Sequence, residues 1–261
     1  MKSLSIFSGI GGMDIGAALA GIEAAGFCEC NAYCRKILRQ HWPDVPIFSD
    51  IRKLKGCDAP EIDIIYGGFP CQDLSNAGRS RKRGLSGERS GLWFEMLRVA
   101  GECRPEWFVA ENVESIYSQD DGNTVKTIVA GLVRIGYEVE CVCTSAATYG
   151  AAFEGRRAFI AAASGSKRHG RSPGKQLALF RRLLVEGEPK RDSVWGEAQG
   201  RIVRAVRSQA SAPGILRSDY GVPDWVDRVK AIDNAVYPLQ AYAIFQPIVS
   251  IFNGHAANPA L

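Results

Sequence analysis

The sequence lacks any apolar run of about 18 residues, the length that a helix needs to cross a bilayer. We therefore expect no membrane span. The first apolar segment begins by Leu4, which leaves no room for a signal peptide. The hydrophobic share of 46% and the charged share of 23% over 261 residues are typical of a globular protein with a large core. These features predict a cytoplasmic globular protein.

The cysteines lack the spacing of metal ligands. Cys28 and Cys30, and likewise Cys141 and Cys143, are separated by one residue on segments with strand character. The chain shows no C-x-x-C pairs accompanied by histidines, so a zinc site is not expected. We predict no metal and reduced thiols, as is usual in the cytoplasm.

The most informative segment is residues 62–72, where the apolar run Ile-Asp-Ile-Ile-Tyr continues into Gly-Gly-Phe-Pro-Cys71-Gln. The run predicts a buried strand of a parallel sheet, and the glycines and proline end it. Cys71 therefore follows the carboxyl end of a strand, where open α/β sheets place their chemistry. An accessible thiolate there is a nucleophile, although a lone cysteine is more often a small buried side chain.

A glycine-rich turn also follows the first predicted strand, in Phe7-Ser-Gly-Ile-Gly-Gly-Met-Asp14. Glycine lets the backbone approach a ligand closely. Asp14 stands where the dinucleotide fingerprint has its third glycine, and basic residues for a pyrophosphate are missing, which favours a neutral or zwitterionic nucleoside. Glu29, eighteen residues after Gly11, is placed to accept hydrogen bonds from ribose hydroxyls. An ordinary βαβ unit with helix-capping acids would show the same pattern.

In combination, six motifs resemble the DNA cytosine-C5 methyltransferase family. In the family's order they are Phe7-Ser-Gly-Ile-Gly-Gly, Glu29 with Tyr33-Cys-Arg, Asp50-Ile-Arg, Gly-Gly-Phe-Pro-Cys71-Gln, Glu111-Asn-Val and Asp233-Asn-Ala-Val-Tyr-Pro. The resemblance covers residues 1–163 and about 224–250. The chain has no Asn/Asp-Pro-Pro-aromatic tetrapeptide, which argues against methylation of an exocyclic amine.

The resemblance implies an α/β fold with a doubly wound, mostly parallel sheet and transfer of a methyl group from S-adenosyl-L-methionine to carbon 5 of a cytosine. That base would be swung out of double-stranded DNA. Cys71 would attack carbon 6, Glu111 would support N3, and Arg157 would donate to the cytosine carbonyl. The resemblance assigns Glu29 to the ribose and Asp50 to the adenine amino group. Contacts to the methyl donor are implied for Phe7, Gly9, Ile10, Gly11, Gly12, Glu29, Cys30, Asp50, Ile51, Gly68, Pro70, Trp93, Asn234 and Val236.

Two departures from the family pattern concern the same site. In the run from Tyr149 to Ile160, Ala152-Phe153 replaces a proline-glutamine pair, and Gly155 stands at the first of two expected arginines. Arg157 takes the second arginine position, and Arg156 is a candidate to replace the lost charge. Asp233 stands where the family has glycine, so its carboxylate would either weaken donor binding or pair with the donor's ammonium group.

Charge divides the chain unevenly. Residues 165–225 hold 12 Lys and Arg against 6 Asp and Glu, a net of +6, whereas the remainder holds 20 against 22, a net of −2. The basic stretch falls where the family inserts its target-recognition region, and phosphate attraction is its natural use, with a solvated linker as the alternative. We predict a catalytic domain over 1–164, a small recognition region over 165–223 and a return to the catalytic domain over 224–261, in a monomer that binds a short DNA target.

The apolar patterns predict strands near 3–7, 26–30, 45–48, 62–66, 107–110, 137–143 and 157–162. Helices are predicted near 13–25, 32–40, 91–102, 123–135 and 239–252, with the last helix beside the first. Three other functions fit the same residues: a tRNA cytosine methyltransferase, a DNA-binding protein that retains the fold with weakened catalysis, and an RNA- or nucleoside-binding module. The sequence leaves the biological role open among restriction partner, phage self-protection and regulation.

Overall fold

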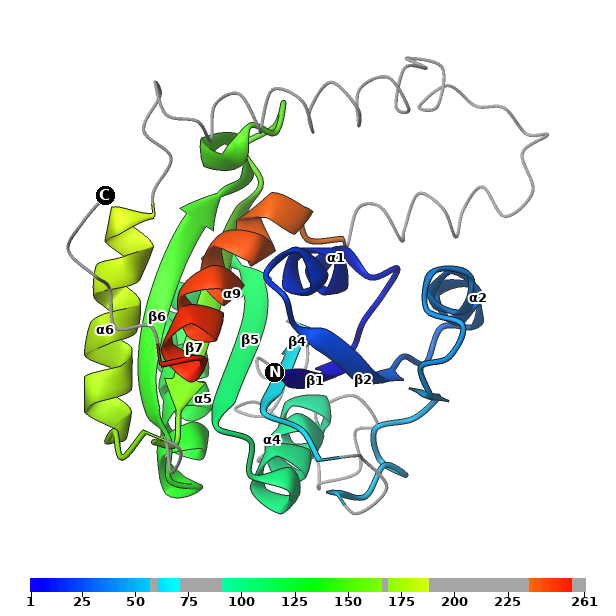
Figure 1. Cartoon of the computed structure of the whole chain (residues 1–261), viewed down its shortest axis with the longest axis horizontal. Coiled ribbons are helices and arrows are strands. Elements are labelled where there is room, and N and C mark those ends of the chain that lie inside the picture. The colour runs from blue at the N-terminus through cyan, green and yellow to red at the C-terminus, as the bar shows by residue number, and fades with distance from the viewer. Residues whose placement is uncertain (57–60, 71–90, 166–168, 188–234, 255–261) are drawn as a thin grey trace.

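A computed structural model describes residues 1–56, 61–70, 91–165, 169–187 and 235–254, which form one seven-stranded sheet with helices on both faces (Figure 1). The strands lie in the order β3 (Ile47–Phe48), β2 (Glu23–Cys28), β1 (Lys2–Ile6), β4 (Ile64–Gly68), β5 (Trp107–Val113), β7 (Arg156–Ala163) and β6 (Glu138–Ser145). Strands β1 to β5 are parallel, and β7 runs antiparallel to both β5 and β6. The predicted doubly wound, mostly parallel sheet is therefore confirmed.

Alternation along β5 builds a core on each face of the sheet. Phe108 and Ala110 join the cluster that packs against α4 (Leu92–Cys103) and α5 (Asn123–Arg134). Trp107 and Val109 point the other way, toward α1 (Gly12–Leu19), α6 (Pro173–Glu186) and α9 (Pro238–Phe252). Successive strand residues face opposite sides, so a strand covered by helices on both faces reads as a continuous apolar run.

Helix α1 is shorter than the predicted span of 13–25. It ends at Leu19 because Gly21 adopts a left-handed backbone with φ 86°, and β2 begins at Glu23. The N–H groups of Gly21 and Ile22 donate to the carbonyls of Ala18 and Ala17, which closes the last turn. A glycine in this conformation is a common way to end a helix.

The other four predicted helices agree with α2 (Ala32–His41), α4, α5 and α9 to within a residue or two. Helix α2 begins at Asn31, whose side chain accepts hydrogen bonds from the N–H groups of Tyr33 and Cys34. Helix α9 lies beside α1, as predicted: a Cβ at Gly16 would come within 2.5 Å of the Pro238 carbonyl oxygen. The close approach of the two backbones requires glycine at position 16.

Helix α6 was not predicted, because residues 164–174 are turn-rich and the whole stretch was attributed to the recognition region. Pro173 starts the helix, and Leu177 and Phe180 are buried in the core that α1 and α9 share. Gln176 donates to Glu106 next to β5, at 2.7 Å. Residues 173–186 thus pack as part of the layered α/β unit. The predicted boundary at 164 stays a prediction.

Short 3₁₀ helices at Glu114–Tyr117, Gln119–Gly122 and Ala146–Tyr149 connect the main elements. None of the helices that the structure describes is long and apolar enough to cross a membrane.

Candidate active site

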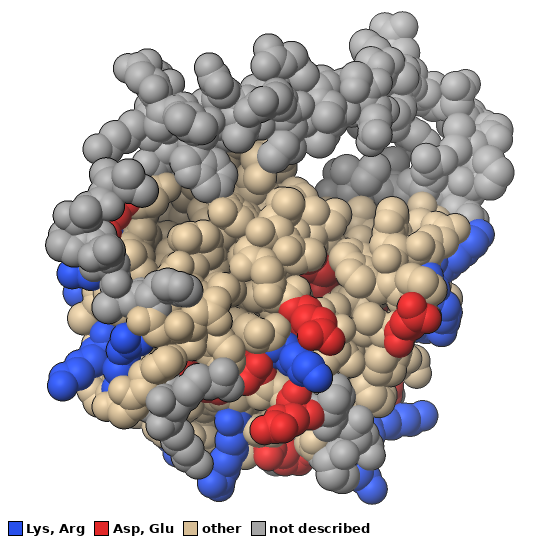
Figure 2. Space-filling model, in the orientation of Figure 1, with Lys and Arg blue, Asp and Glu red and all other residues tan. Residues whose placement is uncertain are grey.

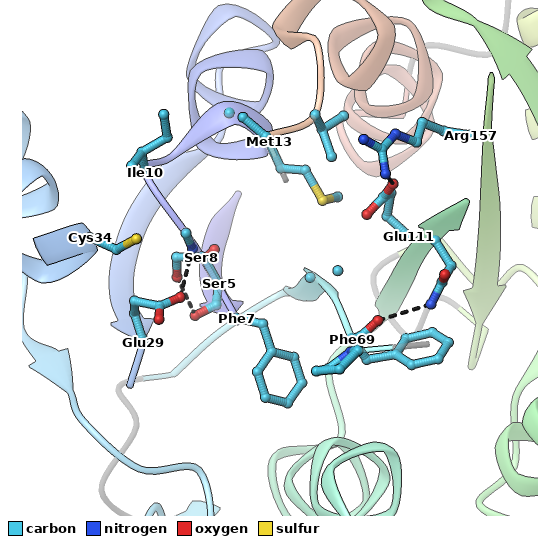
Figure 3. A pocket seen from close by; sticks show the side chains of 18 of the residues that line it. Ser5, Phe7, Ser8, Ile10, Met13, Glu29, Cys34, Phe69, Glu111 and Arg157 are labelled. Atoms are coloured by element: carbon cyan, nitrogen blue, oxygen red, sulfur yellow. Dashed lines mark hydrogen bonds and ion pairs between the residues drawn. The ribbon is translucent and has the colours of Figure 1, made fainter. Parts of the chain in front are cut away.

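A cavity of about 530 Å³ opens at the carboxyl ends of the parallel strands (Figure 3). Residues after β1, β2 and β4 line it, together with the end of β5, the start of β7 and the segment Ala235–Val236 before α9. Its volume falls in the range of ordinary small-molecule sites. In Figure 3, Glu29 and the glycine loop lie on one side, and Glu111 with Arg157 lies opposite.

The glycine loop has an unusual backbone that Glu29 holds in place. Phe7 and Gly9 have φ values of 58° and 56°, in the left-handed region. The Glu29 carboxylate is 8% exposed and accepts the N–H of Gly9 at 2.8 Å through one oxygen and the N–H of Asn31 at 2.7 Å through the other. Bonds to an ionised carboxylate are stronger than neutral ones, so Glu29 fixes the loop while also lining the cavity.

Glycines at the end of β4 give room to the opposite wall. A Cβ at Gly67 would collide with the carbonyl of Ile6 on β1, and one at Gly68 would lie 2.6 Å from Oε2 of Glu111. Beyond them, Asn112 donates from Nδ2 to the carbonyl of Phe69 at 2.9 Å and holds the turn. Pro70 is the last described residue of this turn and lines the cavity.

Glu111 is a buried acid at the end of β5. It is 4% exposed, and its Oε1 lies 3.3 Å from Nη1 of Arg157 without a well-aligned hydrogen bond. Burial raises the pKa of Glu111 to about 7, against the opposing effect of the Arg157 charge. A carboxyl group with this pKa is partly protonated at neutral pH, so it can donate a proton to a ligand.

Arg157 and Arg156 point to different partners. Arg157 lines the cavity, whereas the exposed Arg156 pairs with Glu114 at 3.3 Å and with Glu154 at 3.0 Å. The charge of Arg156 is thus engaged outside the cavity in this structure, and its replacement of the missing family arginine stays a prediction.

Most predicted donor-side residues line the cavity, but five of the described ones do not. The predicted residues that line the cavity are Phe7, Gly9, Ile10, Gly12, Glu29, Gly68, Pro70 and Val236. The residues that lie elsewhere are Gly11, Cys30, Asp50, Ile51 and Trp93. Cys71 and Asn234, together with Asp233, lie outside the described residues.

Three of these five residues contact other parts of the chain or face the solvent. Gly11 packs under Trp42, whose ring would lie 2.8 Å from a Cβ there, and Cys30 is exposed just past the end of β2. Asp50 accepts from the backbone and side chain of Arg52, each at 3.0 Å, which lowers its pKa.

Ile51 and Trp93 belong to the core below the cavity. Trp93 is fully buried, with its ring centroid 5.1 Å from that of Phe69. In this structure Trp93 supports the cavity wall from behind Phe69, and its contact with the donor stays a prediction.

Sequence reasoning missed several lining residues. They are Ser5, Ser8, Met13, Asn31, Cys34, Gly67, Phe69, Asn112, Val113 and Ala235. Most are direct neighbours of predicted residues, so the motifs themselves were the available signal. In the described part of the chain, no group of three or more His, Cys, Asp or Glu side chains is arranged to hold a metal ion.

Comparison with known proteins places this geometry in a family. Residues 1–188 match the model of the C-5 cytosine-specific DNA methylase family. The chain is 36% identical over 141 residues to the Type II methyltransferase M2.BsuMI of Bacillus subtilis, covering 52% of this chain and 35% of that protein. It is 35% identical over 161 residues to M.NgoPII of Neisseria gonorrhoeae, covering 61% and 47%. In these alignments the chain spans about a third to a half of the length of its curated relatives.

Solved structures share the fold over nearly the whole chain. A protein encoded within an E. coli prophage superposes with a TM-score of 0.62 at 17% identity, covering 97% of this chain and 99% of that one. The Entamoeba histolytica methyltransferase EhMeth gives 0.61 at 12% identity, covering 97% and 98%.

The parallel strands and the cavity at their carboxyl ends define an open, doubly wound α/β protein with a small-molecule site. Because the family model matches well over half of its length, the chain belongs to the C-5 cytosine-specific DNA methylase family.

Proposed function

We propose that this chain transfers the methyl group of S-adenosyl-L-methionine to carbon 5 of cytosine in double-stranded DNA, through a covalent bond between Cys71 and carbon 6. The proposal rests on the family match and on one observation. Glu111, buried and with an oxygen that lacks a hydrogen bond, faces the cavity beside Arg157, next to the turn that leads to Cys71.

The opposite side of the cavity suits the donor's nucleoside. Gly12 leaves no space for a Cβ against the Val236 carbonyl oxygen, and Gly9 presents backbone without a side chain. Among the described lining residues, Glu29 is the charged side chain on the side of the glycine loop. Arg157 is the only basic side chain among them, and it lies across the cavity. A carboxylate without a basic clamp fits ribose hydroxyls better than a phosphate chain. When bound, S-adenosyl-L-methionine supplies an electrophilic methyl group on its sulfonium.

The residues then have distinct tasks. The Cys71 thiolate adds to carbon 6, and the displaced electrons move toward carbon 5, N3 and the carbonyl oxygen. Protonated Glu111 donates to N3 and Arg157 donates to the carbonyl, which stabilises the charge as it develops. Carbon 5 then takes the methyl group. A base removes the proton that carbon 5 carried from the start, and the electrons of that bond expel the Cys71 thiolate from carbon 6 and restore the ring.

The test is methyl transfer from labelled donor to duplex DNA, with bisulfite sequencing to locate the modified cytosine. Cys71→Ser should lower the rate by about 10⁴-fold or more, because the hydroxyl is a far weaker nucleophile. S-adenosylhomocysteine should still bind, since Cys71 contacts the base and not the donor. Cys141→Ser, which changes an exposed thiol on β6, is the matched control and should retain full activity.

A duplex with 5-fluorocytosine at the target should trap the protein covalently, because carbon 5 then carries no proton to lose. Full activity of Cys71→Ser, or the absence of a trapped complex in an active wild type, would overturn the covalent mechanism. Methylation of tRNA in place of duplex DNA would reassign the substrate while leaving the chemistry unchanged. Binding of DNA without turnover would favour a binding protein on this fold.

A further inference from the structure

Gln240 is a buried polar residue in an otherwise apolar helix face. Its neighbours on α9 include Leu239, Ala241 and Ile244, all buried, and Gln240 itself is 1% exposed. The two hydrogens of Nε2 are shared among three acceptors: the carbonyl and the hydroxyl of Thr144, both at 2.9 Å, and the carbonyl of Gly155 at 3.2 Å. A buried amide is costly unless it is hydrogen-bonded, so these three acceptors define what the position does.

The acceptors lie at the two ends of the connection between β6 and β7. Thr144 is next to the last residue of β6, and Gly155 directly precedes β7 with a left-handed φ of 46°. Gly155 is two residues from Arg157 and occupies the position where the family pattern has an arginine. The rings of Phe153 and Tyr237 provide a second contact between this connection and the start of α9, at 6.1 Å between centroids.

The same start of α9 also contacts the donor side of the cavity. The Val236 carbonyl oxygen lies so close to Gly12 that a Cβ would approach it to 2.5 Å, and Val236 lines the cavity. One segment therefore touches the glycine loop and the connection that leads into β7 and Arg157.

We propose that Gln240 is a positioning residue that sets the place of Arg157 against Glu111 by holding the backbone of Gly155. The proposal deepens the proposed function, because Glu111 and Arg157 are the groups that would meet the cytosine. Among described residues, Arg157 from β7 is the charged group within ion-pair distance of Glu111. Next to Glu111, the neighbouring strand β4 contributes the backbone of Gly68, and the uncharged Asn112 follows Glu111 on β5. The other charged groups nearby have different partners or positions: Glu114 and Glu154 pair with Arg156, and Glu29 lies across the cavity.

A change in the Arg157 position must alter the proton affinity of Glu111. The Arg157 charge lowers the pKa of Glu111 against the effect of burial. Without Gln240, the Gly155 carbonyl keeps only the 3.3 Å bond from the Ala146 N–H, which is shared with the Glu154 carbonyl. Arg157 then spends less time at 3.3 Å from Glu111, and the pKa of Glu111 rises further. The base then meets a more fully protonated Glu111 but a poorly placed guanidinium.

Gln240→Met tests this, because methionine has a similar length and no donor. The side-chain carboxyl carbon of Glu111, assigned in ¹³C NMR with Glu111→Gln, should titrate about 0.5–1 pH unit higher than in the wild type. The alkaline fall of kcat should move up by the same amount, while the plateau of kcat drops about 10-fold. The KM for the donor should stay within about twofold of the wild type.

Gln246→Met is the matched control on the same helix. Gln246 is exposed and donates to the Ser250 hydroxyl at 3.3 Å, so neither titration nor turnover should change. If Gln240→Met fails to fold, Gln240→Asn keeps a buried amide but is one methylene too short to reach the Gly155 carbonyl, and it should move the Glu111 titration in the same direction.

A folded Gln240→Met protein in which Glu111 titrates as in the wild type would overturn the positioning role, even if stability fell. The NMR titration needs no turnover. A wild type without methyl transfer would therefore refute the proposed function, while the Glu111 titration would still decide whether Gln240 positions Arg157.

Discussion

The two halves of the cavity are built in different ways. On the donor side, residues 7–12 form one continuous turn, and Glu29 holds it through the N–H of Gly9, twenty residues away in sequence. On the base side, Glu111, the turn at Phe69 and the connection at Gly155 come from separate strands, and the bond from Gln240 to Gly155 joins residues 85 apart. The donor side is thus built mainly on one continuous turn, whereas the base side is assembled from separate strands.

This comparison predicts that base-side changes affect the rate and donor-side changes affect binding. The largest effect among the described residues is expected for Glu111→Gln, which keeps the shape but cannot present an ionisable carboxyl. Turnover should fall about 10²–10³-fold, the usual loss for one group that stabilises developing charge. Affinity for S-adenosylhomocysteine, measured by calorimetry, should stay within about twofold.

Glu114→Gln is the control for this change, because Glu114 is exposed and pairs with Arg156. It should leave both turnover and donor affinity unchanged. Equal losses for the two variants would show that general electrostatics near β5, and not the proton on Glu111, supports the reaction.

On the donor side, Glu29→Ala should weaken S-adenosylhomocysteine binding by about 1.5–3 kcal/mol, or roughly 10- to 150-fold. The variant removes the acceptor of the Gly9 and Asn31 N–H groups and frees the loop. Glu23→Ala, an exposed acid at the start of β2, is the matched control. Calorimetry that finds equal affinity for Glu29→Ala and the wild type would remove Glu29 from the donor site.

The sequence predicted the local turns of the site better than the long-range contacts that hold them, for a physical reason. Turns that need glycine, such as the one at Gly9, leave a local pattern of residue types, and so does a strand that ends in Gly-Gly-Phe-Pro. The helix end at Gly21 was equally local and was missed because the apolar pattern ran across it. Gln240 depends on where Gly155 lies in space, and no local pattern encodes that distance.

Helix α6 shows a further limit of local reading. Its residues were attributed to the recognition region because they are basic and follow a turn-rich connector. Only packing shows that Leu177 and Phe180 belong to the core beside β5 and α9. The charges and the buried face lie on opposite sides of one helix, and composition averages over both sides.

Asp14 is a buried acid whose raised pKa predicts how the free energy of unfolding depends on pH. Asp14 on α1 accepts the hydroxyl of Tyr66 on β4 at 2.9 Å, and burial raises the pKa of Asp14 to about 6 from an ordinary 3.8. Between these two values the folded protein keeps the Asp14 proton, whereas the unfolded chain has lost it. The contribution of Asp14 to the free energy of unfolding is therefore complete below about pH 4 and is lost as the pH rises to about 6.

Asp14→Asn should remove this contribution, which is about 3 kcal/mol from two pKa units. Urea unfolding of the wild type should therefore show a fall in the free energy of unfolding between about pH 4 and 6 that is smaller in the variant. Glu111, with a pKa raised to about 7, adds a similar fall at slightly higher pH in both proteins. Identical pH profiles for the two proteins would show that Asp14 titrates normally.

The smallest expected effect is on the affinity for DNA. The basic stretch has two parts, which we compare by their net charge. Residues 165–187 hold 6 Lys and Arg against 1 acid, whereas residues 188–225 hold 6 against 5. Most of the net charge therefore precedes residue 188 in the sequence. Helix α6 lies at the edge of the molecule, where Figure 2 shows basic side chains. There Arg181 pairs with Glu140, and Arg182 lies 3.8 Å from Glu186. Net charge alone thus does not locate the DNA contact.

We still predict that the segment after residue 187, which lies outside the described residues, contacts the phosphates. Replacing Arg201, Arg204 and Arg207 with alanine should flatten the slope of log K against log salt by about one unit for each phosphate-binding arginine removed, and weaken all sequences alike. The matched pair Arg181→Ala and Arg182→Ala should change the slope little, since carboxylates already neutralise both charges. Should the pair on α6 flatten the slope while the triple variant does not, phosphate binding belongs to α6. DNA would then approach the molecule over the α6–α9 face, and the segment after residue 187 would have to act on base edges alone.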